Sequence, residues 1–287
     1  MHKAKPSLLN SEIKFIFSNS QKLLQKSVEY LFQFSVNNKP ETIKINITDI
    51  PPSDDCIKSK GLVKESFYDA RYQFFFSEEL YYFVQLHTSK LGWHNSGAFR
   101  TLFYFAYAVQ NEILPKGGLP VHSCLLAVNG LSVLLVGDSG VGKTTCCNRV
   151  TPILEGHSDD LAFIVKKKNQ YFAHPYMTMS ECTKETLSTP RDIHTCLPLK
   201  AIFFLEQSNN DQVKPIPAHE ASLKLYHAAS LMVRGFDRSS NCSVKQKNTT
   251  LFNNACDIIK AIPSYRLKAS LNGRFWEKIQ NTMDLNV

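Results

Sequence analysis

Hydrophobic and polar positions alternate most clearly at residues 42–48, where Ile43, Ile45 and Ile47 share one face. This period of two predicts a β-strand. The other apolar runs that predict strands are residues 12–17, 68–76, 81–86, 161–165, 170–173, 199–205 and 265–271. Apolar positions at helical spacing predict helices at residues 22–34, 96–114, 220–233 and 250–262, with a short one from Phe275. The interleaving of the two periods predicts an α/β (α+β) fold.

Two further apolar runs, residues 121–128 and 131–136, are separated by Asn129 and Gly130. An Asn-Gly pair between apolar runs is the strongest short signal for a β-hairpin. We therefore expect the second run to be one arm of an antiparallel hairpin. A strand that feeds a glycine-rich phosphate loop normally belongs to a parallel βαβ unit, so the predicted hairpin is an unusual feature.

The segment that follows this hairpin fits the pattern G-x-x-x-x-G-K-[ST], which indicates a P-loop (Walker A motif). Glycines let the backbone wrap around phosphates so that N–H groups converge on the anion. Lys143 is expected to reach the β- and γ-phosphates, and the Thr144 hydroxyl to ligate Mg²⁺. The predicted nucleotide-binding residues are Gly137, Asp138, Ser139, Gly140, Val141, Gly142, Lys143, Thr144 and Thr145. Because the motif lies between a predicted strand and a short helix, we favour this interpretation over a chance glycine turn.

Asp159 and Asp160 follow the P-loop closely in the sequence. The segment between Lys143 and Asp159 is long enough for one short helix and a chain reversal, which would bring both carboxylates beside the phosphates. One carboxylate could ligate Mg²⁺ while the other accepts a proton from an attacking hydroxyl. The structural alternative is a pair that caps a helix or forms a turn. His122, at the start of the hairpin, would lie near the phosphates and could tune a base or contact phosphate.

Residues 122–145, followed by residues 158–160, resemble the core of bacterial HPr kinase/phosphorylase. This resemblance implies a P-loop fold with a mixed sheet, similar to that of phosphoenolpyruvate carboxykinase rather than of ordinary kinases. It also implies the roles of general base for Asp159, active-site helper for His122, phosphate ligand for Lys143, and metal ligands for Thr144 and Asp160.

Other segments resemble the HPr-kinase-like component of SynChlorMet cassettes, which accompany radical-SAM enzymes and a precursor peptide. These segments are residues 143–147, 173–175, 201–206 and 270–276. The resemblance implies an ATP- and Mg²⁺-dependent kinase that phosphorylates a Ser or Thr hydroxyl of a peptide or protein. The precursor peptide is the natural acceptor, and radical-SAM maturation enzymes are candidate partners. The alternative is a non-catalytic, nucleotide-dependent module that recruits the peptide to its modifying enzymes.

Two properties of true HPr kinases are not carried over by this resemblance. Their glycine- and arginine-rich C-terminal signature is not found in the sequence, so we expect neither HPr as the acceptor nor the reverse reaction, phosphorolysis of phospho-HPr. Arg191 could stabilise phosphoryl charge, although a solvated surface side chain is the alternative. The choice between ATP and GTP stays open, as does a homo-oligomeric state.

The expected organisation has two parts. Residues 1–116 form an aromatic-rich α/β portion, with a loose polar end over residues 1–10 and a turn at residues 54–55. Residues 117–287 form the HPr-kinase-like nucleotide-binding domain. Within it, residues 176–198 are rich in Thr, Ser, Pro and charge, and we expect an exposed loop there.

The charge of the chain narrows the choice of partners. The chain carries 33 Lys and Arg against 25 Asp and Glu, a net charge of +8. This excess suits a polyanionic ligand, but the basic residues are dispersed apart from residues 166–168, which we interpret as a solvated turn. We therefore expect no nucleic-acid partner. The apolar runs are shorter than a transmembrane helix requires, so no membrane partner is expected either.

The eight cysteines include no C-x-x-C pair, and we recognise no secretory signal. Free thiols in a nucleotide-binding protein fit a reducing compartment, so we expect a cytoplasmic location. Cys146 and Cys147 follow the P-loop on the predicted helix, where we expect them to pack against the core rather than to bind a metal ion.

Overall fold

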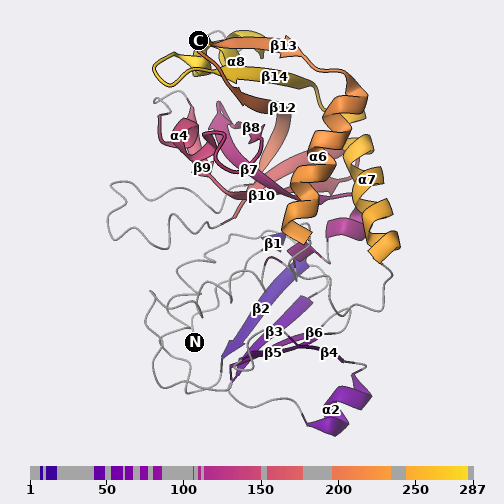
Figure 1. Ribbon diagram of the computed structural model, residues 1–287. Helices are drawn as coiled ribbons and strands as arrows, with labels where there is room; N and C mark the ends of the chain where they lie inside the picture. Colours follow the sequence, from indigo (N-terminus) through magenta and orange to yellow (C-terminus); the bar gives the residue numbers. More distant parts are fainter. Residues whose placement is uncertain are drawn as a thin grey trace. The chain divides into compact units, whose positions relative to one another are not determined.

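The computed structural model forms two compact units, residues 1–109 with 238–241, and residues 110–237 with 242–287. The residues that it describes are 7–8, 11–17, 42–48, 53–60, 62–66, 72–76, 80–85, 106, 109–110, 113–149, 154–176, 196–233 and 244–283. Figure 1 shows both units, coloured along the sequence.

The first unit contains a six-stranded sheet in the order β1-β2-β3-β6-β5-β4 among its described residues. The strands are β1 (Ser7–Leu8), β2 (Ser11–Phe17), β3 (Thr42–Thr48), β4 (Val63–Ser66), β5 (Tyr72–Phe76) and β6 (Leu80–Gln85). Strands β2, β3 and β6 are parallel, whereas β5 is antiparallel to both β6 and β4. The predicted strand at 42–48 is confirmed. The runs predicted as strands at residues 68–76 and 81–86 contain β5 and β6, which pair antiparallel.

Three predictions for this unit were wrong or lie outside the described residues. Strand β1 lies within the first ten residues, where we expected a loose end, because it pairs with β2. The expected turn at residues 54–55 is the first turn of helix α2 (Asp54–Ser59), whose N-cap Ser53 accepts a hydrogen bond from the Cys56 amide at 3.2 Å. Acidic side chains in a first turn are favoured by the helix dipole. The predicted helix at residues 22–34 lies outside the described part of the chain.

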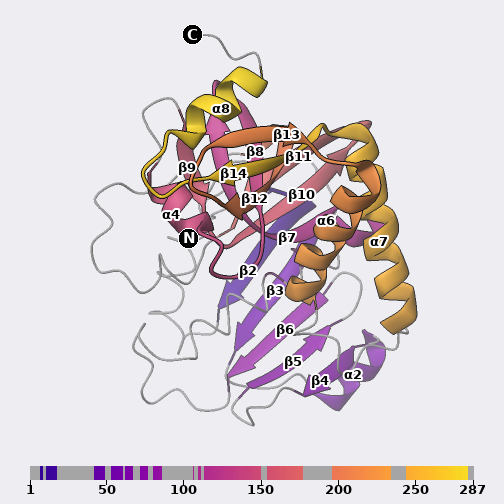
Figure 2. The ribbon, with the colours of Figure 1, turned by 45° about the horizontal axis from the view of Figure 1, so that its top comes forward.

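The described residues of the second unit form an eight-stranded mixed sheet (Figures 1 and 2). Seven strands follow the order β11-β10-β7-β8-β12-β14-β13, and the eighth, β9, pairs with β7. Its strands are β7 (Leu119–Val128), β8 (Leu131–Val136), β9 (Glu155–Ser158), β10 (Leu161–Lys167), β11 (Gln170–Pro175), β12 (Leu197–Gln207), β13 (Gln212–Pro215) and β14 (Ser264–Ala269). Strands β8, β12 and β14 are parallel, and the other pairings are antiparallel. The sequence-based expectation of an α/β protein with a mixed sheet is thus confirmed.

The predicted hairpin is present as β7–β8, with Ser123 opposite Val136 and Val128 opposite Leu131. Asn129 and Gly130 have φ angles of 48° and 74°, as a tight hairpin turn requires. The far edge of β8 pairs in parallel with β12. One strand therefore joins an antiparallel hairpin to a parallel set, and the segment after Val136 emerges between the two.

Side chains of β8 alternate between two hydrophobic clusters, one on each face of the sheet. Leu134 and Val136 pack in the cluster that contains helices α6 (Ala218–Val233) and α7 (Val244–Ala261). Val133 and Leu135 pack in the cluster that contains α4 (Lys143–Asn148) and α8 (Phe275–Thr282). Figure 2 shows α6 and α7 side by side. The expected packing of Cys146 and Cys147 is confirmed, because both are buried in the α4 cluster.

Several element ends in this unit differ from the prediction. Strands β9 and β13 were not predicted, and β12 is longer than the expected run at residues 199–205. A 3-10 turn, η2 (Leu114–Lys116), precedes β7, which begins at Leu119 rather than at the predicted residue 121. In the triplet at 166–168, the first two lysines belong to β10 and only Lys168, with a φ of 54°, forms the turn.

Two longer predicted segments fall largely on residues that the structure does not describe. Of the predicted helix at 96–114, only the residues at 106, 109–110 and 113 are described as helical. Of the expected loop at 176–198, residues 177–195 lie outside the described chain, while 197–198 belong to β12. Among the described helices, none is both long enough and apolar enough to cross a bilayer.

Candidate active site

The glycine-rich loop, defined here as residues 137–142, connects the end of β8 to the start of α4. Gly140 and Gly142 have φ angles of 81° and 103°, a backbone region that side chains with a Cβ rarely adopt. The Val141 amide donates a hydrogen bond to the Asp138 carbonyl at 3.3 Å, which closes a turn within the loop. Two of the loop's three glycines, one of them in the motif, are thus required by the backbone path itself.

The carboxyl end of β12 supports the glycine-rich loop from one side. A Cβ atom on Gly137 would lie 3.2 Å from the Leu205 carbonyl and 2.9 Å from the Val141 side chain, so glycine allows a close approach there. The Gln207 side-chain amide donates a hydrogen bond to the Gly140 carbonyl at 3.2 Å. The loop is therefore held against a strand that the motif alone does not identify.

Lys143, the first residue of α4, is buried and reaches back across the glycine-rich loop. Its Nζ donates hydrogen bonds to the carbonyls of Gly137 at 2.8 Å and Asp138 at 2.9 Å. Burial lowers the pKa of this ammonium, while the charge of Asp160 acts in the opposite direction. The next two side chains, Thr144 and Thr145, are exposed at the start of the helix.

His122 and Asp160 form an ion pair beside this loop, with 3.1 Å between Nε2 and Oδ1. The sheet aligns them, because His122 of β7 lies opposite Leu161 of β10 and the Ser123 amide donates to the Asp160 carbonyl at 3.2 Å. The hydrogen bond from His122 lowers the pKa of the Asp160 carboxyl, and the Lys143 charge acts in the same direction. Asp160 is therefore held as a carboxylate, with a side chain that is 45% exposed.

Asp159 lies beside this pair and is only 2% exposed. Asp159 and Asp160 occupy the short connection between β9, which ends at Ser158, and β10, which begins at Leu161. Both residues therefore connect two strands, which agrees with the alternative that they form a turn. The structure also brings Asp160, His122 and Lys143 into one electrostatic cluster, as the carboxylate hypothesis requires.

The donors available for a cation are oxygen atoms. Within the described residues, no group of three or more His, Cys, Asp and Glu side chains is arranged to hold a metal ion. The Asp160 carboxylate and the Thr144 hydroxyl are hard oxygen donors, the kind that Mg²⁺ prefers, and Mg²⁺ commonly takes its remaining ligands from phosphates and water. The residues present therefore fit Mg²⁺ bound together with a nucleotide better than a metal ion bound by protein alone.

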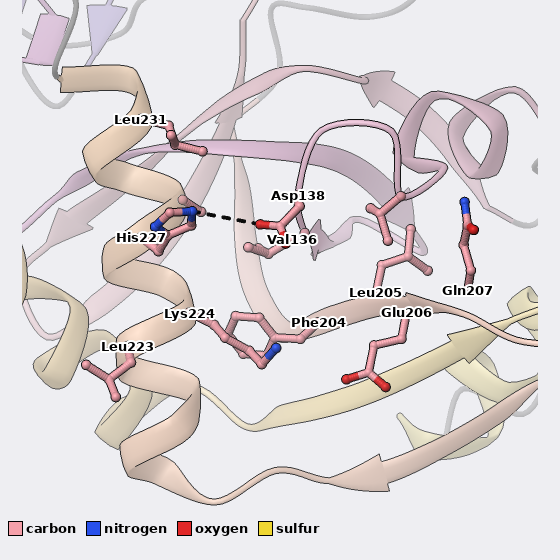
Figure 3. A pocket seen from close by; sticks show the side chains of 13 residues that line it. Val136, Asp138, Phe204, Leu205, Glu206, Gln207, Leu223, Lys224, His227 and Leu231 are labelled. Atoms are coloured by element: carbon pink, nitrogen blue, oxygen red, sulfur yellow. Dashed lines mark ion pairs between the residues drawn. The ribbon is translucent and has the colours of Figure 1, made fainter.

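A pocket of about 540 Å³ opens on the other side of the glycine-rich loop (Figure 3). Its walls come from the glycine-rich loop, from the end of β12, and from α6. The polar residues that line it are Asp138, Glu206, Gln207, Lys224 and His227. His227 Nε2 lies 3.9 Å from Asp138 Oδ1, and both side chains are exposed.

Arg266 of β14 fixes one wall of this pocket. Its Nε lies 3.0 Å from Glu206 Oε1, and its Nη2 donates to Glu220 Oε1 on α6 at 2.5 Å. The guanidinium thus ties the end of β12 to the start of α6. Sequence reasoning selected the loop residues Gly137, Asp138 and Val141 that line this pocket, but assigned no site role to its residues on β12 and α6. The available signal was Glu206, a carboxylate directly after the apolar run at residues 201–205. The candidate Arg191 lies outside the described chain.

Fold and site together define an α/β protein with a mixed sheet, in which a glycine-rich loop is flanked by a His–Asp pair and a pocket. The family model described as SynChlorMet cassette protein ScmC matches residues 100–284. Since this match covers more than half of the chain, the chain belongs to that family, as the sequence resemblance predicted.

A curated relative is consistent with this assignment. Over 81 residues the chain is 37% identical to a protein named HPr kinase/phosphorylase from Mycoplasmopsis pulmonis (strain UAB CTIP). The aligned stretch covers 27% of this chain and 22% of the relative, so the chain matches about a fifth of that protein's length. The likeness hints at a kinase-like role and leaves the substrate open.

Proposed function

We propose that this protein is an ATP- and Mg²⁺-dependent kinase that phosphorylates a Ser or Thr hydroxyl of a peptide or small protein. The natural acceptor is the precursor peptide of a radical-SAM modification cassette. The observation that carries the proposal is the His122–Asp160 pair, which lies beside a glycine-rich loop whose lysine it influences electrostatically. The family assignment and the partial likeness to an HPr kinase/phosphorylase support it.

In this proposal the glycine-rich loop and Lys143 bind the nucleotide phosphates. The Lys143 ammonium now donates to two loop carbonyls, and it would exchange these for phosphate oxygens without leaving the loop. Phosphoryl transfer depends mainly on positioning and on neutralising charge. Mg²⁺, held by Asp160 and Thr144, would supply part of that neutralisation. The alternative nucleotide is GTP.

Asp159 is proposed as the general base that accepts the proton of the acceptor hydroxyl. It is buried beside the His122–Asp160 pair, so a hydroxyl bound there would be shielded from water. His122 has the role of a positioning residue, because its hydrogen bond keeps Asp160 ionised and in place. A general base of this kind typically contributes about 10²–10⁴-fold to the rate.

The test incubates the protein with ATP, Mg²⁺ and the precursor peptide, and follows the peptide by mass spectrometry. A gain of about 80 Da, the mass of one phosphoryl group, is the expected result. Asp159→Asn should retain ATP affinity while transfer falls by about 10²–10⁴-fold. Asp257→Asn is the matched control, because Asp257 is a 58% exposed carboxylate on α7, and it should leave transfer unchanged.

Equal transfer rates for the wild type and Asp159→Asn would reject Asp159 as the base. ATP-dependent peptide binding without any mass gain would favour the alternative, a non-catalytic module that recruits the peptide to its modifying enzymes. Failure to bind ATP would contradict both.

A further inference from the structure

The pocket beside α6 is continuous with the glycine-rich loop but separate from the His122–Asp160 pair. Gly137 and Val141 of the loop line the pocket, whereas His122, Asp159 and Asp160 are not among the residues that line it. An occupant of the pocket would therefore touch the phosphate loop without touching the acidic residues.

The α6 wall of the pocket and His122 lie on different sides of the sheet, while Val141 and Leu205, which also line the pocket, pack in the cluster with α4. Val136 and Phe204, which line the pocket, pack in the cluster with α6 and α7. His122 lies two residues before Cys124 on β7, and Cys124 packs in the cluster with α4. Because side chains two apart on a strand share a face, His122 belongs to the α4 side. An acceptor hydroxyl against the α6 wall of the pocket would lie on the opposite side of the sheet from His122.

The chemistry of the pocket suits an uncharged ring with polar edges. Leu223, His227 and Leu231 are spaced four residues apart, so they form one stripe along α6 (Figure 3). The leucines are 56% and 37% exposed, so their apolar surface is open to an occupant of the pocket. Opposite them, Glu206 presents a carboxylate at the end of β12, while the Gln207 amide donates to the Gly140 carbonyl. This mixture of apolar wall and few polar groups is typical of small-molecule sites.

The position of the pocket agrees with the parallel part of the sheet. Strands β8, β12 and β14 run in parallel, and the pocket lies where β8 and β12 end. In open α/β sheets, ligands bind outside the carboxyl ends of such strands. The volume of about 540 Å³ lies within the usual range of ligand sites and exceeds what the phosphates, held in the loop, would need.

We propose that this pocket binds the nucleoside part, base and sugar, of the nucleotide whose phosphates the glycine-rich loop holds. The proposal rests on the proposed function, since it assigns a second part of the same ligand. It places nucleoside recognition on α6 and the end of β12, and acceptor chemistry on the opposite side of the loop. Leu223 and Leu231 provide the apolar wall, and Glu206 faces the polar edge of the base.

The test compares two ligands that share phosphates but differ in the nucleoside, namely ATP and inorganic tripolyphosphate, each with Mg²⁺. Isothermal titration calorimetry measures both on the full chain. The double substitution Leu223→Ala and Leu231→Ala should weaken ATP binding by about tenfold, because it removes much of the apolar wall. Tripolyphosphate affinity should stay within about twofold. Leu271→Ala is the matched control, because Leu271 is 73% exposed and does not line the pocket.

Thermal unfolding measures whether each variant is folded. If the double variant does not fold, the single variant Leu223→Ala is used in its place. Unchanged ATP affinity in a folded variant overturns the proposal. So does a variant that keeps ATP affinity but loses the precursor peptide, because the pocket then holds the acceptor. If the wild-type protein binds tripolyphosphate as tightly as ATP, the nucleoside site is rejected and the proposed function is not. If the wild-type protein binds neither ligand, both are rejected.

Discussion

The two sides of the glycine-rich loop are built in different ways. On the β7 side, His122 and Asp159 are largely buried and Asp160 is held as a carboxylate by a 3.1 Å ion pair. On the α6 side, His227 and Asp138 face one another at 3.9 Å, and both are exposed. Groups that must hold a fixed protonation state benefit from burial and close partners, whereas a site that admits a ligand must stay open. This contrast fits the proposals that phosphoryl transfer occurs on the first side and nucleoside recognition on the second.

The largest effect that separates the two sides is expected from Lys143→Met. This residue contacts the loop carbonyls rather than the pocket, so the substitution should weaken ATP and tripolyphosphate alike. The loss should be about 10- to 100-fold, because charged hydrogen bonds contribute about 1.5–3 kcal/mol each. Calorimetry with both ligands measures it, and Lys260→Met, at a 76% exposed lysine on α7, is the control. A loss confined to ATP would remove Lys143 from the phosphate site.

An intermediate effect on stability is expected where the β7 side is most tightly packed. A Cβ on Gly156 of β9 would lie 2.7 Å from Cys147 Sγ and 2.8 Å from its carbonyl oxygen, so Gly156→Ala should cost about 1–3 kcal/mol of unfolding free energy. A Cβ on Gly140 meets open space, and Gly140→Ala should cost about 1 kcal/mol through its φ angle alone. Urea denaturation measures both. Equal losses would contradict the idea that β9 is packed tightly onto α4.

The smallest effect concerns the pH dependence set by His122. The hydrogen bond from His122 lowers the pKa of Asp160, so His122→Phe should raise that pKa towards its ordinary value. The wild-type pair adds stability above the ordinary pKa of an aspartate, and this contribution is lost as the pH falls through the lowered value. The difference in unfolding temperature between wild type and His122→Phe should therefore be present near neutral pH and vanish in acid.

His122→Phe should also move the acid limb of the pH–rate profile of phosphoryl transfer to higher pH, because Asp160 then becomes protonated at a higher pH. His122→Gln is the matched variant, since its amide can still donate to Asp160, and its acid limb should remain close to that of the wild type. Identical acid limbs for all three proteins would show that His122 does not control the ionisation of Asp160.

Much of the β7 side could be predicted from the sequence because its signals are local. The Asn129–Gly130 turn fixes the register of β7 and β8, and the register places His122 beside the glycine-rich loop. The short helix α4 and the return to Asp160 follow within the next residues. Each of these steps depends on near neighbours in the chain, which periodicity and turn chemistry can describe.

The α6 side could not be predicted because it depends on long-range pairing. Glu206 and Gln207 reach the glycine-rich loop only because β12 pairs in parallel with β8, and His227 only because α6 packs on the same face. Strands β9 and β13 were missed for a related reason, since short polar segments such as Glu155–Ser158 become strands only by pairing with a neighbour. Their sequences carry no alternation of their own.

The β7–β8 hairpin has a consequence for the order in which the protein assembles. The contacts that unite His122, Lys143 and Asp160 span fewer than forty residues (122–160), whereas the pocket needs segments as far apart as residues 136 and 231. Local contacts cost less loop-closure entropy and form sooner. During refolding, we expect the amides of the β7 side to gain protection from hydrogen exchange before those of the segments that line the pocket. During synthesis, the acidic site would be in place before the ribosome has made α6.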